Sequence, residues 1–176
     1  MSNTDHQQNL LTTTTLRIAG IIPETITDGD GFRASIYVQG CPHKCEGCHN
    51  AHTHDFNGGE VLSLQDIINK VYPNPLLAGL TFSGGEPFCQ AEPLAILADW
   101  AKQMNLNIWC YSGYTLEELK ELAKTNKPIA DLLSKTDTLV DGKFIQEQKD
   151  LTLRFRGSKN QRIIDLRSIM NKANEK

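Results

Sequence analysis

Three cysteines lie within eight residues of this chain, at Cys41, Cys45 and Cys48, with the spacing CxxxCxxC. Thiolates packed this closely in one loop can converge on a single inorganic core. A cubane iron–sulfur cluster normally takes four cysteine thiolates, so three neighbouring ligands leave one iron open. An open iron can bind a substrate. The triplet therefore predicts a [4Fe–4S] cluster that acts as a reagent and not as a structural clip.

A zinc site is the alternative interpretation of the same loop, because zinc held by three cysteines and one histidine is common. Zinc sites usually join two separated ligand pairs, whereas every candidate ligand here lies within residues 41–54. Cys89 and Cys110 stand alone in apolar surroundings and are expected to be small core residues. A zinc-binding interaction module remains the non-enzyme hypothesis. Its fourth ligand would be one of four histidines: His43, His49, His52 or His54.

A second motif is the run Ser83-Gly-Gly-Glu-Pro87. Two glycines alone indicate only a turn that ends a strand. Beside an open iron, however, Gly84 and Gly85 would let the backbone approach a ligand closely. Glu86 adds a carboxylate suited to an ammonium group, as an amino acid chelating iron would present. The motif therefore predicts a binding loop for such a ligand.

The elements that must position these motifs alternate along the chain. Short apolar strands are predicted over 34–39, 80–82, 107–111 and 138–140, with helices over 63–72, over 92–104 and from Thr115. Ser63 and Thr115 are expected helix caps, each with an acidic residue three positions later. Further strands are expected over 16–22 and 162–166. This alternation predicts a parallel sheet with crossover helices.

Each polar motif follows the carboxyl end of a predicted strand. In barrels and open α/β sheets, ligands bind at that edge, so the motifs are expected to converge. A complete eight-fold barrel takes about 250 residues, and the chain has 176. We therefore predict an α/β fold with a partial, open (β/α) barrel. Residues 1–15 are expected to be a mobile tail, and 16–176 a single domain.

Composition excludes several classes of protein. The chain is 39% hydrophobic and 22% charged, as in globular domains, and its net charge of −3 gives no reason to expect nucleic acid. No apolar stretch is long enough to cross a membrane, and the polar N-terminus is unlike a signal peptide. Five cysteines, three of them clustered, fit a reducing compartment and a metal centre. A cytoplasmic location is therefore expected.

The cysteine triplet followed by Gly-Gly-Glu-Pro resembles the radical S-adenosylmethionine (SAM) enzymes. The match narrows to the family of anaerobic ribonucleoside-triphosphate reductase-activating proteins, over about residues 17–167. Glycyl-radical activators often carry proline where this chain has Asp30, and no insert for an auxiliary cluster is present. The resemblance is carried by Asp28-Gly-Asp-Gly-Phe-Arg33, Val38-Gln-Gly-Cys-Pro-His43, Tyr111-Ser-Gly-Tyr114, Leu139-Val-Asp-Gly-Lys-Phe144 and Arg154-Phe-Arg-Gly-Ser-Lys-Asn-Gln161.

This resemblance implies the ligands of the cofactors. The three cysteines would hold a [4Fe–4S] cluster, and the methionine part of SAM would chelate the fourth iron. Gly47 and His49, which flank the last cysteine, would lie near the adenosyl group. The loop of Gly84, Gly85 and Glu86 would hold the methionine amine.

Three further residues are weaker candidates for contacts to cofactor or partner: Ser112, Asp141 and Lys143. Ordinary loop polarity explains them equally well. Asp141 would bind ribose or partner backbone, and Lys143 would pair with a carboxylate.

The segment 149–167 has six basic and two acidic residues, a net charge of +4 that leaves −7 on the rest of the chain. It is either a solvated face, a docking surface for a protein partner, or a source of an arginine that binds the SAM carboxylate.

By resemblance, the chain is an oxidoreductase that activates a glycyl-radical enzyme. An electron donor such as flavodoxin would reduce the cluster, and SAM would be cleaved reductively. The resulting radical would take hydrogen from a glycine of the large subunit of an anaerobic ribonucleoside-triphosphate reductase. The alternative target is another glycyl-radical enzyme, or a small molecule as in a 7-carboxy-7-deazaguanine synthase-like role.

Overall fold

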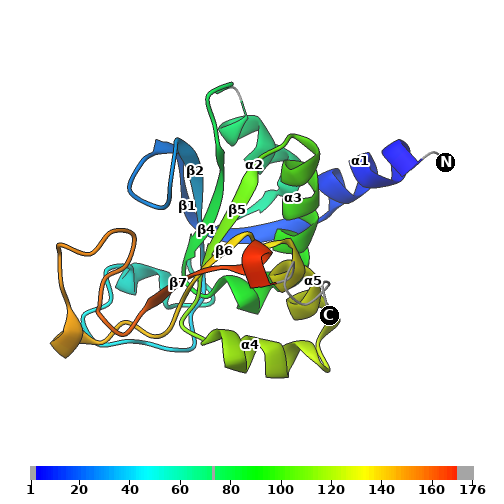
Figure 1. The fold of residues 1–176 in the computed structure, drawn as a ribbon. Helices are drawn as coiled ribbons and strands as arrows, with labels where there is room; N and C mark the ends of the chain where they lie inside the picture. The colour runs from blue at the N-terminus through cyan, green and yellow to red at the C-terminus, as the bar shows by residue number, and fades with distance from the viewer. Residues whose placement is uncertain (1–2, 73, 170–176) are drawn as a thin grey trace.

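The computed structural model describes residues 3–72 and 74–169, which form a mixed α/β fold around one seven-stranded sheet (Figure 1). The strand order is β3-β1-β2-β4-β5-β6-β7, so β3 and β7 are free edges and the sheet is open. The predicted α/β fold with a partial, open (β/α) barrel is confirmed. The strands are β1 (Thr15–Thr25), β2 (Arg33–Val38), β3 (Glu60–Ser63), β4 (Gly79–Gly84), β5 (Asn107–Tyr111), β6 (Thr138–Asp141) and β7 (Arg162–Asp165).

Only the centre of the sheet is parallel. β2, β4, β5 and β6 run in the same direction, whereas β1, β3 and β7 are antiparallel to their neighbours. Parallel neighbours need a crossover, which the predicted helices supply, but β1 reaches β2 through a short turn and must therefore run antiparallel. The parallel prediction thus holds for the four strands that carry the motifs.

Five labelled α-helices flank the sheet in the part of the chain that the structure describes: α1 (Asn3–Thr13), α2 (Leu64–Val71), α3 (Ala91–Gln103), α4 (Leu116–Ala123) and α5 (Lys127–Lys135). Residues 166–169 are also helical. The two predicted caps are confirmed. The side chain of Ser63 accepts a hydrogen bond from the Asp66 amide, and Thr115 forms a complete capping box with Glu118. The sequence analysis missed β3 and α5. The start of α5 has a recognisable signal, since Asn126 caps it and proline occupies its first turn.

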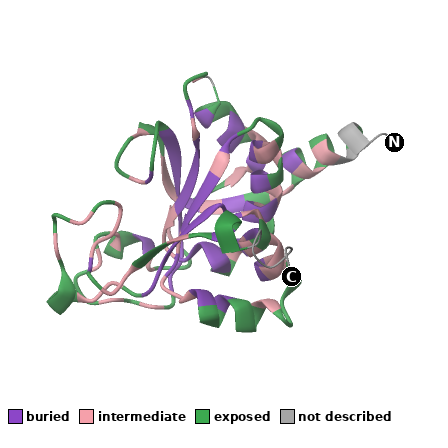
Figure 2. Ribbon diagram, in the orientation of Figure 1, coloured by how far each residue is buried: buried purple, intermediate pink, exposed green. Residues whose placement is uncertain are grey.

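The two faces of the sheet differ in polarity. Strand residues alternate between the faces, and the apolar set packs with the helices in one core (Figure 2). This set comprises Ala34, Ile36, Val38, Leu80, Phe82, Ile108 and Cys110. The neighbouring positions on the same strands carry polar or aromatic side chains, namely Arg33, Ser35, Tyr37, Thr81, Ser83, Trp109 and Tyr111. This second face is the one that loops cover instead of helices.

Arg33 is a buried charged residue on the polar face of the sheet, and it connects three strands. Its side chain is fully buried, and the guanidinium donates to the Thr81 hydroxyl at 2.7 Å, the Leu80 carbonyl at 2.6 Å and the Asn107 side chain at 2.8 Å. It also lies over the ring of Trp109, 5.5 Å from the centroid. Burial lowers the pKa of Arg33 to about 10. A buried charge needs this number of partners, so Arg33 fixes how β2, β4 and β5 align.

The N-terminal segment differs from the expected mobile tail. Residues Asn3–Thr13 form α1, which projects from the domain in Figure 1 but buries Leu11 in the core. Gln8 also bonds to Gln65 of α2 at 3.0 Å. Leu11 and the partly buried Leu10 place the end of this helix against the domain. Residues 1–2 and 170–176 lie outside the described part, and the domain limits remain a prediction.

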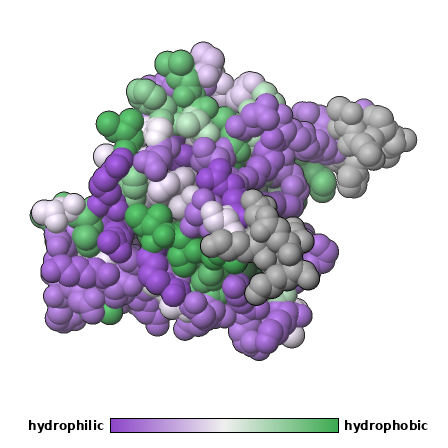
Figure 3. Space-filling view, viewed as in Figure 1, coloured by the Kyte–Doolittle hydropathy of each residue, from purple (hydrophilic) through white to green (hydrophobic). Residues whose placement is uncertain are grey.

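The surface seen in Figure 3 is mostly hydrophilic. Hydrophobic side chains gather at the tip between α2 and β4 and around β7, where Leu76 and Ile163 are exposed. Within the described ranges, no helix has the length and apolarity needed to cross a bilayer.

We expect Arg33→Met to lower the free energy of unfolding by about 3 kcal/mol, because buried acceptors lose their donor at a cost of about 1–3 kcal/mol each. Urea unfolding of the metal-free protein measures this change. Arg167→Met is the matched control, since Arg167 pairs with Asp165 at the surface and such pairs contribute under about 1 kcal/mol. Equal effects of the two substitutions would contradict the role assigned to Arg33.

Candidate active site

A hollow of about 460 Å³ opens at the carboxyl ends of the four parallel strands. Its lining includes the three clustered cysteines, Gly84 and Gly85 after β4, and Ser112 and Gly113 after β5. Gly142, which follows β6, also lines it. The structure therefore brings the four strand-end motifs together at one edge, as the sequence predicts. A cavity of this size can hold a nucleoside-sized ligand.

All three clustered cysteines are free thiols on one wall of the hollow. Cys41 is buried, and Cys45 and Cys48 are half-buried. Burial raises the pKa of Cys41 and of Cys48 above the ordinary value for a thiol. These thiols are therefore held protonated until a metal displaces the proton.

The residues around the hollow are compatible with a bound inorganic group. Three thiols line it, and thiolates are the usual ligands of iron–sulfur clusters. His54 also lines the hollow, and its buried Nε2 has no hydrogen-bond partner in the structure. An unpaired polar atom beside three thiols suits a site that a bound group completes.

The Gly84–Gly85 loop lies directly against the cysteine loop. The Gly85 amide donates to the Val38 carbonyl and the Glu86 amide to the Gly40 carbonyl, both at 2.8 Å. A Cβ on Gly85 would lie 2.3 Å from the Gly40 carbonyl oxygen, and Gly84 has a φ of +92°. The predicted close approach is therefore made to the cysteine loop itself. Both glycines still line the hollow.

The side chain of Glu86 does not line the hollow, which differs from its predicted contact with a ligand. It is fully buried, and its carboxylate accepts hydrogen bonds from the Phe88 amide at 3.1 Å and the Gly113 amide at 2.9 Å. The Ser112 hydroxyl donates to both oxygens at 3.0 and 3.1 Å, and Nε2 of His43 lies 2.8 Å from Oε2. Protein donors thus saturate the carboxylate.

Ser112, by contrast, does lie on the wall of the hollow. Its hydroxyl donates to Glu86 and accepts from the Tyr114 amide at 3.0 Å. The hydroxyl therefore ties the turn after β5 to the loop after β4, and its contact to a cofactor remains a prediction.

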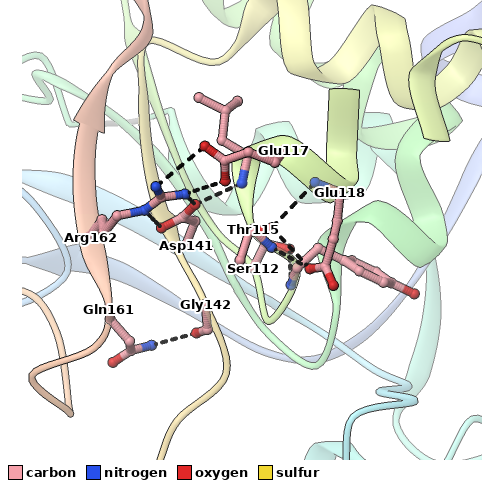
Figure 4. A network of polar contacts seen from close by, with 10 residues as sticks. Ser112, Thr115, Glu117, Glu118, Asp141, Gly142, Gln161 and Arg162 are labelled. Atoms are coloured by element: carbon pink, nitrogen blue, oxygen red, sulfur yellow. Dashed lines mark hydrogen bonds and ion pairs between the residues drawn. The ribbon is translucent and has the colours of Figure 1, made fainter. Parts of the chain in front are cut away.

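Asp141 and Lys143 are not among the residues that line the hollow. The carboxylate of Asp141 is 1% exposed and accepts from the Leu116 amide at 2.7 Å and from Nε of Arg162 at 2.9 Å (Figure 4). Arg162 also donates to Glu117 at 2.6 Å, and its hydrogen bonds to the carboxylates of Asp141 and Glu117 raise its pKa. Lys143 is exposed to solvent. Asp141 thus joins β6, β7 and the start of α4, which favours the structural explanation of both residues.

Gly47 and His49 occupy different places in the cysteine loop. Gly47 has a φ of +69°, and a Cβ there would lie 2.1 Å from Oε1 of Gln146, so this residue packs against the loop after β6. His49 lines the hollow, with its ring centroid 5.1 Å from that of Phe144. His49 is thus available to a ligand in the hollow, whereas Gly47 shapes the loop.

The opposite wall comes from residues 142–161, between β6 and β7. In Figure 1 this orange loop lies beside the cyan cysteine loop. It contributes Phe144, Leu153, Phe155 and Arg156 to the lining. One nitrogen of Arg156 donates to the Gln161 carbonyl at 2.6 Å. One of the three interpretations of segment 149–167, an arginine that binds the SAM carboxylate, places this run beside the site, and that contact remains a prediction.

Ion pairs within the domain use most of the positive charge of segment 149–167. Arg154 pairs with Asp30 at 3.2 Å, Lys159 with Asp150 at 3.7 Å and Arg167 with Asp165 at 3.3 Å. Arg162 is paired as described above. The segment is therefore not an unpaired basic patch, and a docking role for it remains a prediction.

The sequence patterns also did not predict a cluster of polar side chains beside the hollow, formed by Asp28 and by two residues of β2. Asp28 accepts hydrogen bonds from the hydroxyls of Ser35 at 2.7 Å and Tyr37 at 2.6 Å. Tyr111 lies nearby on the same wall, and burial raises the pKa of both tyrosines. The Asp28 motif had been interpreted only as a turn. The alternation of Ser35 and Tyr37 on one strand face was a signal for this cluster.

Comparison with known proteins decides the family. A family model described as a 4Fe–4S single cluster domain matches residues 27–164. The anaerobic ribonucleoside-triphosphate reductase-activating protein of Haemophilus influenzae is 36% identical over 147 residues, covering 79% of this chain and 91% of that protein. The chain belongs to the family of anaerobic ribonucleoside-triphosphate reductase-activating proteins. The family predicted from the motifs is therefore confirmed.

Other members of the activating-protein family give the same result. The Escherichia coli protein is 35% identical, covering 82% of this chain and 96% of its own length, and the phage T4 protein is 32% identical, covering 81% and 90%. Among solved structures, QueE from Escherichia coli has a TM-score of 0.49 and 16% identity, covering 62% of this chain and 57% of that one. The family model supports an iron–sulfur centre and leaves the zinc-module hypothesis without support.

We expect Gly85→Ala to destabilise the metal-free protein by about 2 kcal/mol, because overpacking typically costs about 1–3 kcal/mol. The new methyl group would collide with the backbone of Gly40 and separate the two loops. Urea unfolding measures the change. The matched control is Gly20→Ala, because no atom lies within 4 Å of a Cβ at Gly20. If Gly85→Ala were as stable as the control, the close packing of the loops would be refuted.

Proposed function

We propose that the chain cleaves SAM reductively and generates a glycyl radical on the large subunit of an anaerobic ribonucleoside-triphosphate reductase. The observation that carries this proposal is the shared hollow. Three free thiols and a glycine loop line it in a member of the activating-protein family. Three thiolates leave one iron of a cubane for a substrate, and the hollow has room for that substrate.

Cys41, Cys45 and Cys48 would hold the [4Fe–4S] cluster. When bound and reduced by a donor such as flavodoxin, the cluster supplies the electron that splits SAM into methionine and a 5′-deoxyadenosyl radical, which takes a hydrogen atom from the partner's glycine α-carbon. The protein's task is to position these groups and exclude competing reactions. The half-buried thiols and the apolar wall from Leu153 and Phe155 serve that task.

The remaining lining suggests how SAM would lie. The backbone of Gly84 and Gly85 would face its amine, and the part of the Arg156 guanidinium that Gln161 leaves unused would face its carboxylate. His49, packed against Phe144, would flank the adenosyl group. Each of these groups lines the same hollow as the cysteines.

The alternative targets are another glycyl-radical enzyme or a small molecule. The names of the relatives favour the reductase, since all of those compared are called activating proteins of that enzyme. A protein substrate also requires an open site, and this hollow is open to solvent. We also propose that the protein acts in the cytoplasm and that its electron donor is a protein such as flavodoxin.

Cys45→Ala should abolish 5′-deoxyadenosine formation and lower iron per chain after anaerobic reconstitution, because the cluster loses one of three ligands. Chromatography of the nucleoside and iron analysis measure the two effects. Cys89→Ala is the control, since Cys89 lies outside the triplet and is exposed, so that the expected core position holds for Cys110 and not for Cys89. Native SAM cleavage by Cys45→Ala would refute the cluster assignment.

Mixing the reconstituted protein with SAM, dithionite and the reductase large subunit should produce a glycyl doublet in the electron-spin-resonance spectrum. A large subunit whose radical-bearing glycine is replaced by alanine should give no doublet. SAM cleavage that proceeds without a doublet, while a small molecule is consumed, would favour the alternative target.

A further inference from the structure

We propose that His43 is a positioning residue, whose hydrogen bond to Glu86 sets the cysteine loop against the Gly84–Gly85 loop. This inference rests on the proposed function, because those two loops would hold the cluster and the SAM amine. It gives Glu86 a different role from the predicted one. The carboxylate would act through His43 and the neighbouring loops, and the amine would be left to the backbone of the glycines.

The His43–Glu86 contact is short and shielded from water. Nε2 and Oε2 are 2.8 Å apart, and the two side chains are 6% and 0% exposed. The other partners of the carboxylate, Phe88, Ser112 and Gly113, are all donors. A carboxylate only accepts, so Nε2 of His43 carries the hydrogen that completes the set. A buried carboxylate stripped of one donor is costly, which makes this arrangement strongly preferred.

Packing against the turn after β5 restricts the ring of His43 to one orientation. It packs edge-on against Tyr114, with centroids 4.5 Å apart and an interplanar angle of 75°. A Cβ on Gly113 would lie 2.3 Å from Cδ2 and 2.6 Å from Nε2 of the ring, so only glycine leaves room for it. The turn after β5 therefore determines the orientation of a histidine from the loop after β2.

The places of the two residues in the chain explain what the contact controls. His43 lies between two of the clustered cysteines, Cys41 and Cys45, and Glu86 directly follows Gly85. On the main-chain side, the Glu86 amide donates to the Gly40 carbonyl at 2.8 Å. The cysteine loop is thus held to Glu86 both before and inside the triplet. A shift of His43 would move thiols relative to the glycine backbone.

The test compares His43→Gln with His43→Leu. The glutamine amide nitrogen can take the place of Nε2, whereas leucine fills space without a donor. In metal-free His43→Leu, we expect hydrogen exchange of the amides in residues 41–48 to accelerate on the order of tenfold. A change of this size corresponds to the loss of about one buried hydrogen bond. His43→Gln should stay close to the native protein. His52→Leu, an exposed histidine of the same region, is the matched control.

The same variants, reconstituted and matched for iron per chain, give a second readout. His43→Leu should bind SAM on the order of tenfold more weakly and show a smaller SAM-induced change in the spin-resonance spectrum of the reduced cluster. His43→Gln should restore both. Gly113→Ala provides a variant that keeps both partners but displaces the ring, and it should reproduce the exchange pattern of His43→Leu.

The proposal is overturned if His43→Leu exchanges and binds SAM like the native protein, or if His43→Gln is as defective as His43→Leu. Failure of the proposed function would look different. The native protein would then not cleave SAM at all, while exchange in the metal-free variants would still report on the hydrogen bond.

Discussion

The buried carboxylate of Glu86 is the interaction on which the site depends. A carboxylate removed from water requires donors, and here they come from the loop after β2, the turn after β5 and the residues that follow Glu86 itself. Three strand ends must therefore meet at one level of the sheet. The parallel pairing of β2, β4 and β5 produces that alignment, so the sheet and the site constrain each other.

Two other buried charged side chains are also stabilised by hydrogen bonds with several elements. Arg33 is enclosed on the polar face of the sheet and is held by acceptors from β4 and β5. Asp141 is enclosed at the end of β6 and receives donors from α4 and β7. Glu86, Arg33 and Asp141 each connect elements that are distant in sequence. The hollow lies between the cysteine loop and residues 142–161.

An ion pair connects the turn before β2 to the opposite wall of the hollow. The carboxylate of Asp30 pairs with Arg154 at 3.2 Å. Both side chains are largely exposed, so the pair contributes little to stability. It does, however, neutralise an arginine that the sequence alone offered as free positive charge. Four of the six basic residues of segment 149–167 pair with carboxylates of the same chain, although their side chains stay largely exposed.

Local patterns in the sequence determined the cysteine triplet, the helix caps at Ser63 and Thr115, the four central strands and the edge where their motifs meet. Each depends on neighbouring residues, so it can be found without a structure. The tertiary structure alone decided the partners of charged residues. His43 and Glu86 are 43 positions apart, and nothing local to either predicts that they bond. Glu86 was expected to face a ligand, and Asp141 was open between a ligand contact and ordinary loop polarity. Long-range packing commits both carboxylates to the protein itself.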